Sequence, residues 1–264
     1  MITSATNATV KAARRLRHRR AREESGTFLI EGIRLVGQAL ESGATIRRLM
    51  VAPELLDSTY ARGIVERLRS SGVDVVDVSP AVFRGLSARE NPQGIAAVVQ
   101  QVWTPLGEIT HLGGLGWVAL DAVADPGNLG TILRTCDAVG CEGVLLLGAA
   151  TDPHDPSAVR ASMGAIFSQQ MARASFEEFA AWKTAHGHSF VGTSGESTQL
   201  YRAVAYPAPM VLLMGSERQG LTVAQREICD AVVRIPMVGT ADSLNLAVAT
   251  SVVLYEVFHQ QQSR

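Results

Sequence analysis

Residues 235–257 read IPMVGTADSLNLAVATSVVLYEV, and this stretch decides the fold of the second half of the chain. An apolar run over 231–235 predicts a buried strand that stops at Pro236, because proline cannot donate a hydrogen bond to a sheet. Small and flexible residues follow, and Ser243 stands where the N-cap of a long helix over 244–260 is expected. The helix is apolar nearly all round, which predicts that it is buried.

Two polar residues, Ser243 and Asn245, stand at the start of this predicted helix. Buried polar groups need hydrogen-bond partners, and a bound ligand is one candidate. The alternative from this stretch alone is a capped core helix preceded by a solvated loop.

The composition indicates a globular protein of one or two domains. The chain has 264 residues, of which 47% are hydrophobic and 19% charged. No run approaches the roughly 18 apolar residues of a membrane span, and the basic N-terminus lacks the apolar core of a secretory signal. Its three cysteines form no C-x-x-C pair and its six histidines are scattered, so we expect a cytoplasmic protein with reduced thiols and no metal.

The net charge of -1 conceals an asymmetry between the two halves. Residues 1–100 hold 15 Lys and Arg against 10 Asp and Glu, and most of the excess lies near the start. An arginine-dense helix there is a candidate phosphate-binding element, although a solvated, frayed terminus is the alternative. The residues proposed to bind nucleic acid are Lys11, Arg14, Arg15, Arg17, Arg19 and Arg20.

The first half alternates short strands and helices and predicts an α/β domain over residues 1–102. A linker rich in proline and glycine follows over 103–114. The expected strands are 27–30, 47–51, 74–78 and 94–102, and the expected helices are 31–42, 57–71 and 80–86.

The second half, 115–264, has longer apolar strands between helices, which predicts a parallel sheet covered on both faces. The expected strands are 117–121, 143–147, 190–193, 210–214 and 231–235. The expected helices are 129–139, 176–185 (with Ser175 and Glu178 as a capping box), 223–229 and 244–260.

Ligands of such sheets bind beyond the carboxyl ends of the strands. The loops expected there are 124–130, 193–195, 215–221 and 236–243. The first of them has neither G-x-G-x-x-G nor a Walker lysine, so a dinucleotide or nucleoside triphosphate site finds no support.

Three features near these loops are unusual. Arg134 lies off the apolar stripe of the helix after the first loop, which suggests an anionic partner, although Asp137 at i+3 is an alternative. Glu217 stands between two glycines after an apolar strand, where a carboxylate is costly unless paired or functional, or serves as a charge for the next helix. The small residues of 161–164 permit either close backbone approach or tight packing.

Three motifs occur together and in order: N-x-G-x-x-x-R, G-x-E-x-x-G-L and I-P-M followed by S-L-N. With them the chain resembles the SpoU (TrmH-like) branch of the SPOUT RNA methyltransferases. They correspond to Asn128, Gly130 and Arg134; Gly215, Glu217, Gly220 and Leu221; and Ile235–Met237 with Ser243–Asn245. The first half is similar to the family's L30e-like substrate-binding domain, through Asn7, Lys11 and Arg14, FLIEG at 28–32 and NPQGI at 91–95.

The resemblance implies an α/β fold whose C-terminal segment forms a trefoil knot, a topology that general rules of chain connection would exclude. It implies that the knot loops, 215–221 and 236–245, bind S-adenosylmethionine, and that the last helix packs across a homodimer interface. The cofactor-binding residues implied are Thr193, Met214, Gly215, Ile235, Met237, Ser243 and Leu244.

The implied reaction is methyl transfer to a ribose 2′-hydroxyl, with Arg134 as the family's catalytic residue. A guanidinium with a pKa above about 12 is not expected to deprotonate, so we expect Arg134 to polarise the hydroxyl or hold a neighbouring phosphate. The residues expected to orient it are Asn128, Glu217, Ser243 and Asn245.

Family members with this N-terminal domain mostly act on ribosomal RNA, so 23S rRNA is the first expectation and transfer RNA the alternative. A catalytically idle RNA-binding protein is a hypothesis of another class, which the intact motifs disfavour. An oxidoreductase is disfavoured because the glycine fingerprint is missing.

Overall fold

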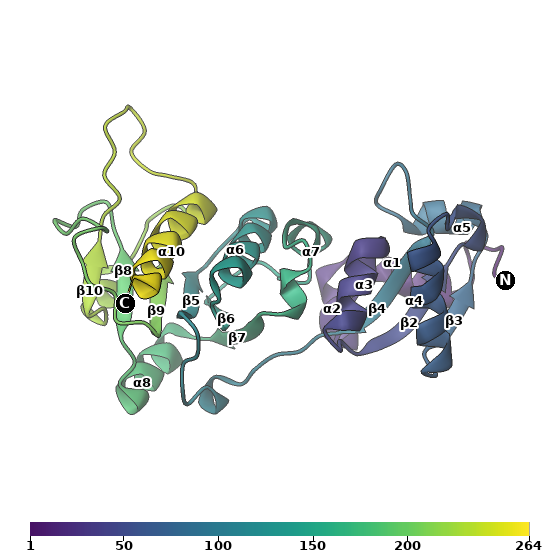
Figure 1. Ribbon diagram of the computed structural model, residues 1–264, viewed down its shortest axis with the longest axis horizontal. Helices are drawn as coiled ribbons and strands as arrows, with labels where there is room; N and C mark the ends of the chain where they lie inside the picture. Colours follow the sequence, from purple (N-terminus) through teal and green to yellow (C-terminus); the bar gives the residue numbers. More distant parts are fainter. Residues whose placement is uncertain (264) are drawn as a thin grey trace. The chain divides into compact units, whose positions relative to one another are not determined.

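A computed structural model describes residues 1–263, which divide into two compact units (Figure 1). Unit 1 comprises residues 1–101 together with 154–167, and unit 2 comprises 102–153 and the chain from 168 onward. The segment 154–167 lies in the second half of the sequence but packs with the first. The expected α/β class is confirmed.

Unit 1 is built on a four-stranded mixed sheet with the order β1-β4-β2-β3. β4 is antiparallel to both β1 and β2, whereas β2 and β3 are parallel. Its strands are β1 (Thr27–Glu31), β2 (Ile46–Val51), β3 (Asp74–Asp77) and β4 (Ile95–Gln100). Its helices are α1 (Ala8–Arg15), α2 (Arg19–Ser25), α3 (Ile33–Glu41), α4 (Thr59–Ser70), α5 (Pro80–Leu86) and α7 (Pro156–Ala161), with short 3₁₀ turns η1 (Pro53–Leu55) and η3 (Ala165–Phe167).

The core of unit 1 includes residues from the distant segment. Val159 of α7 and Ile166 of η3 are buried in the same cluster as Phe28 and Ile30 of β1. The buried Arg22 donates to the backbone oxygens of Leu16 and Arg17 (2.9 Å each), and its guanidinium lies 3.5 Å from the carboxylate of Asp155. The segment 154–167 is therefore part of this core.

Unit 2 is built on a six-stranded sheet with the order β10-β8-β9-β5-β6-β7, in which every neighbouring pair is parallel. Its strands are β5 (Gly116–Asp121), β6 (Gly143–Leu147), β7 (Gln170–Ala174), β8 (Phe190–Thr193), β9 (Met210–Met214) and β10 (Ala231–Val233). Its helices are α6 (Pro126–Val139), α8 (Phe176–His186), α9 (Val223–Glu227) and α10 (Leu246–Gln262), with the 3₁₀ turn η2 (Leu106–Glu108).

The central strands of unit 2 are buried along nearly their whole length, as a sheet with both faces covered requires. The expected capping box of α8 is present, since Ser175 accepts from the backbone N–H of Glu178 while the Glu178 carboxylate accepts from that of Ser175. β7 was not expected, because the charged Arg173 interrupts its apolar pattern.

The last helix differs from its prediction in two respects. α10 begins at Leu246 and its N-cap is Asn245, not Ser243, because the Asn245 side chain accepts from the N–H groups of Ala247 and Val248. It is also not buried all round, since Val248 is 49% and Tyr255 53% exposed in the single chain. α10 packs against α6, and one face is left uncovered.

Other elements also differ from the sequence-based expectation, and the arginine-dense N-terminal segment forms two helices, α1 and α2, instead of one. α6 begins at Pro126, three residues early, because Asp125 caps it and proline suits the first turn. α7 was not expected as a helix, although Asp155 and Pro156 begin it in the same way. β10 ends at Val233, and Arg234 bonds instead to the backbone of Gln199 and Tyr201. Within residues 1–263, no helix has the length and apolar character to cross a membrane.

Candidate active site

A cavity of about 880 Å³ opens in unit 2 where β8, β9 and β10 end. Its walls come from three loops that follow strands: 193–196 after β8, 214–221 after β9, and the two ends of the β10–α10 loop, 233–237 and 241–246. The loop between β10 and α10 extends away from the sheet (Figure 1). The family resemblance places Thr193, Met214, Gly215, Ile235, Met237, Ser243 and Leu244 in a cofactor site, and all seven line this cavity.

Asn128 connects the polar residues of three loops. Its side-chain N–H donates to Glu217 Oε1 (2.6 Å), and its carbonyl oxygen accepts from Asn245 Nδ2 (2.9 Å). Asn128 is itself held by the first turn of α6, because its backbone N–H donates to Asp125 Oδ1 (2.7 Å). The loop after β5, the loop after β9 and the loop before α10 therefore meet at Asn128, which lies at the wall of the cavity.

Asn245 combines two functions. Its side-chain oxygen accepts from the N–H groups of Ala247 (2.9 Å) and Val248 (3.3 Å), while its side-chain NH₂ group donates to Asn128 Oδ1. Both ends of the carboxamide are thus occupied, which fixes the loop before α10 relative to α6. Ser243 is exposed, and its hydroxyl lies 3.4 Å from Asp242 Oδ1.

The loop after β9 requires glycine at its first position. A Cβ at Gly215 would lie 2.1 Å from the carbonyl carbon of Gly220 and 2.3 Å from the nitrogen of Leu221. Ser216 and Gly220 then exchange two backbone hydrogen bonds, of 3.2 and 2.9 Å. The chain closes tightly on itself, which presents the backbone at Gly215 to the cavity.

Arg134 does not line the cavity. It is exposed on α6, six residues beyond Asn128, or about 9 Å along a helix axis. The alternative of a pair with Asp137 is not observed within residues 1–263, and Asp137 accepts instead from the hydroxyl of Ser168 (2.5 Å). The structure therefore leaves this guanidinium available to a group that approaches from outside.

An ion pair at the cavity was not found from the sequence. Arg226 of α9 donates to the carboxylate of Glu196, and both residues line the cavity. They are 30 positions apart, so no local spacing could have indicated that they meet.

Two of the three cysteines, Cys136 and Cys229, have raised pKa values. A hydrogen bond with Cys141, together with burial, raises the pKa of Cys136 well above its usual range. Burial raises the pKa of Cys229 to about 12. A thiolate nucleophile is therefore not supplied by either residue at neutral pH.

The six basic residues proposed to bind nucleic acid lie in or beside α1 and α2 of unit 1. Arg17 is engaged by the backbone oxygens of Leu86 (2.6 Å) and Ser87 (2.8 Å). Arg19 and Arg20 pair with Glu23 and Glu24 at i+4 (2.8 and 2.7 Å), on exposed faces where such pairs contribute little and exchange readily. Lys11 and Arg15 are exposed, and Arg14 is half-buried.

Both halves of the chain match families of known proteins. Residues 117–255 match the SpoU rRNA Methylase family, and residues 7–97 match the MRM3-like substrate binding domain. A 23S rRNA (uridine(2479)-2'-O)-methyltransferase of Streptomyces viridochromogenes is 34% identical, over 94% of this chain and 88% of that protein. The 23S rRNA (guanosine(2553)-2'-O)-methyltransferase RlmP of Bacillus subtilis is 30% identical, over 97% of this chain and 98% of that protein.

A solved structure supports the same relationship. The crystal structure of an AdoMet-bound rRNA methyltransferase from Sinorhizobium meliloti superposes with a TM-score of 0.89 at 40% identity, covering 98% of this chain and 97% of that one. The resemblance that the three motifs indicated is confirmed: the chain belongs to the SpoU rRNA methylase family.

Proposed function

We propose that this chain transfers a methyl group from S-adenosylmethionine to a ribose 2′-hydroxyl of ribosomal RNA. One observation carries the proposal: Asn128 bridges Glu217 and Asn245, and so joins the three family motifs beside a cavity. The names of the curated relatives, both 23S rRNA 2'-O-methyltransferases, support ribosomal RNA as the substrate.

The cavity fits the proposed cofactor. Its volume of about 880 Å³ lies within the range of roughly 300–1,000 Å³ typical of small-molecule sites. Apolar side chains such as Met214 and Leu221 can cover an adenine ring, while the close approach at Gly215 offers backbone groups to it. When bound, S-adenosylmethionine supplies a methyl group on a positively charged sulfur. The residues proposed to hold it are Thr193, Met214, Gly215, Ile235, Met237, Ser243 and Leu244.

Arg134 is proposed to contact the RNA and not the cofactor. Its position outside the cavity lining suits a group that meets an acceptor entering from solvent. The guanidinium would polarise the 2′-hydroxyl or hold the adjacent phosphate, since an arginine side chain stays protonated in proteins and does not act as a base. Asn128, Glu217, Ser243 and Asn245 would orient the acceptor beside it.

The test is Arg134→Ala in the full chain, assayed with labelled cofactor on deproteinised ribosomal RNA and on transfer RNA. Removing a group that stabilises the transition state predicts a decrease of about 100- to 1,000-fold in transfer rate, with cofactor affinity within a few-fold of wild type. The matched control is Arg202→Ala, which removes an exposed arginine paired only loosely with Glu256 (3.8 Å). Transfer at the wild-type rate by Arg134→Ala refutes the assignment.

The same assay decides between the alternatives. Transfer of the labelled methyl group to transfer RNA alone would identify the chain as a tRNA methyltransferase. Label on neither RNA, with RNA binding retained, would make it an idle RNA-binding protein. The basic residues Lys11, Arg14, Arg15, Arg17, Arg19 and Arg20 are proposed to hold RNA phosphates, so binding should weaken steeply with salt.

We further propose residues 1–102, packed with 154–167, as the RNA-binding domain, 103–114 as a linker and the rest of 115–264 as the methyltransferase domain, with the knot formed by 215–221 and 236–245. A homodimer through α10 is supported by the uncovered Val248 and Tyr255. A cytoplasmic location is proposed because ribosomal RNA is found there.

A further inference from the structure

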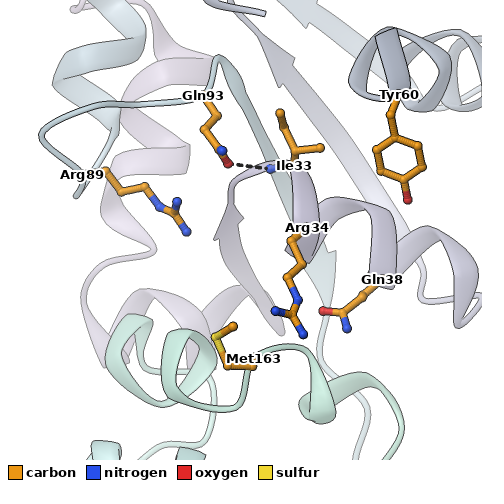
Figure 2. Close-up of a pocket in the computed structure, with 7 residues that line it drawn as sticks. All are labelled: Ile33, Arg34, Gln38, Tyr60, Arg89, Gln93 and Met163. Carbon is orange, nitrogen blue, oxygen red and sulfur yellow. Dashed lines mark hydrogen bonds between the residues drawn. The ribbon is translucent and has the colours of Figure 1, made fainter. Parts of the chain in front are cut away.

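A second cavity, of about 550 Å³, lies wholly within unit 1 (Figure 2). It is bounded by the first two turns of α3, the loop between α5 and β4, Tyr60 of α4 and Met163 of the 154–167 segment. None of the residues discussed above for cofactor or RNA binding lines it. The proposed reaction therefore assigns this cavity no role.

Two arginines give the cavity a positive charge. Arg34 of α3 and Arg89 of the α5–β4 loop are exposed, and neither forms an ion pair within residues 1–263. Two neighbouring carboxylates have other partners, since Glu31 accepts from Ser87 and from the N–H of Ala88, and Glu41 accepts from Tyr60. Both guanidinium groups are thus free to bind an anion.

The start of α3 adds to this charge. The helix has no acidic residue in its first turn, and Gly32, at φ 103°, provides no side-chain cap. Gln93 accepts from the N–H of Ile33 (3.1 Å), which fixes the α5–β4 loop and Arg89 against the helix (Figure 2). The positive end of the helix dipole and the two arginines therefore border the same cavity.

Gln38 adds a hydrogen-bond acceptor to the lining of the cavity. Its Oε1 atom is buried and has no hydrogen-bond partner within residues 1–263. It lies on the same face of α3 as Arg34, one turn further along, and borders the cavity. A buried acceptor without a donor is unfavourable, and an N–H or O–H group of a ligand would satisfy it, whereas the phosphodiester of an RNA backbone has neither group.

Met163 provides an apolar surface beside these polar groups. Its backbone has a positive φ of 53°, which is strained for a residue with a side chain, and Gly164 follows at φ 105°. A Cβ at Gly164 would lie 1.8 Å from Gln38 Oε1, so this turn must approach Gln38 closely. The strained turn brings the Met163 side chain to the same cavity as Gln38, where the flat face of a base can pack against it.

We propose that this cavity holds one unpaired nucleotide of the substrate RNA, with its phosphate against Arg34 and Arg89 and its base against Met163 and Gln38. A nucleotide carries both the anion and the N–H or O–H donor that the lining requires. The inference rests on the proposed function for the identity of the RNA, and it adds a binding site away from the cofactor cavity.

The test measures binding of the full chain to deproteinised 23S rRNA over a range of salt concentrations, without cofactor. The double variant Arg34→Ala/Arg89→Ala should bind at least 10-fold more weakly, and the slope of log K against log salt should fall by about 0.7 to 0.9 for each phosphate that is no longer bound. Gln38→Leu should weaken binding without changing the slope. The matched control is Arg47→Ala, an exposed arginine at the start of β2 bonded to Gln100.

Wild-type affinity and slope in the double variant overturn the proposal. A reduced slope with no effect of Gln38→Leu overturns the nucleotide assignment, since the cavity would then bind backbone phosphate alone. Methyl transfer by the wild-type protein separates this outcome from failure of the proposed function. If the wild type methylates rRNA and the double variant does so with unchanged KM, only the cavity proposal is wrong.

Discussion

At the scale of single residues, the site depends on side chains that each bind two partners. Asn128 joins Glu217 to Asn245, and Asn245 also caps α10. Such shared groups make the polar network cooperative, because removal of one member leaves another polar group without a partner. Substitutions that remove one hydrogen bond and keep the other therefore separate structure from catalysis.

Asn245→Asp is the substitution that makes this separation. A carboxylate still accepts from the first N–H groups of α10, and its charge suits the helix start, so thermal stability should be retained. It cannot donate to Asn128, and it brings a second negative charge toward Glu217, so methyl transfer should be abolished. Asn245→Ala should abolish transfer and also reduce stability by about 1 kcal/mol.

The measurements are the thermal unfolding midpoint and the rate of methyl transfer for the two variants. Transfer at the wild-type rate in Asn245→Asp would show that the donation to Asn128 is dispensable.

Gly215→Ala tests the tight loop after β9. The added Cβ would lie 2.1 Å from backbone atoms of Gly220, so the 215–221 loop must open and cofactor binding should fall at least 10-fold. Gly195→Ala is the matched control, since it lines the same cavity and a Cβ there meets nothing within 4 Å. Calorimetric titration with S-adenosylmethionine compares them, and equal affinities would contradict the role of the loop.

At the scale of elements, the last helix, α10, carries apolar residues both on its buried face and on a face that is exposed in the single chain. One face is buried, with Val253, Leu254 and Val257, whereas Val248 and Tyr255 are exposed in the single chain. Val248 and Tyr255 are seven positions apart and therefore lie on the same side of the helix, and an exposed apolar side of a helix suits an interface between subunits. The proposed homodimer would cover this face.

Tyr255→Asp tests that interface. In a dimer the charge would be buried without a partner, which disfavours association, whereas on a free surface it would change stability little. Light scattering should give a molecular mass of twice 28.1 kDa for the wild-type protein and of about 28.1 kDa for the variant. Tyr60→Asp is the control, because Tyr60 is 54% and Tyr255 53% exposed. A monomeric wild type would exclude the dimer.

At the scale of the whole molecule, the chain does not divide at one point. The segment 154–167 leaves unit 2 between β6 and β7 and supplies Val159 and Ile166 to the core of unit 1. It also brings Met163 to the cavity proposed to hold a nucleotide. The stability of the first 101 residues therefore depends on residues encoded far downstream.

Ile166→Ala in the full chain measures this dependence. Truncating a buried isoleucine typically costs about 2–5 kcal/mol, and the destabilisation should appear in unit 1. Hydrogen exchange should accelerate in β1 and β4 and remain unchanged in β5 and β6. Leu145→Ala, in the core of unit 2, should give the reverse pattern. Protection of β1 that is unaffected by Ile166→Ala would show that the segment adds nothing to that core.

The sequence by itself determined the features that depend on neighbouring residues. Apolar runs predicted most strands, Ser175 and Glu178 predicted the start of α8, and three motifs indicated the family. These follow from local backbone preferences and from side-chain spacing, which a linear pattern contains.

Only the tertiary structure decided which distant residues meet. In the structure the N-cap of α10 is Asn245 and not Ser243, and Asn128 is hydrogen-bonded to Glu217. The segment 154–167 packs in unit 1, and Arg134 lies outside the cavity lining. The physical reason is that these arrangements depend on how the sheet aligns its loops and on which polar groups find partners there. Such choices are settled by contacts between segments as far as 133 positions apart or more, which no local pattern specifies.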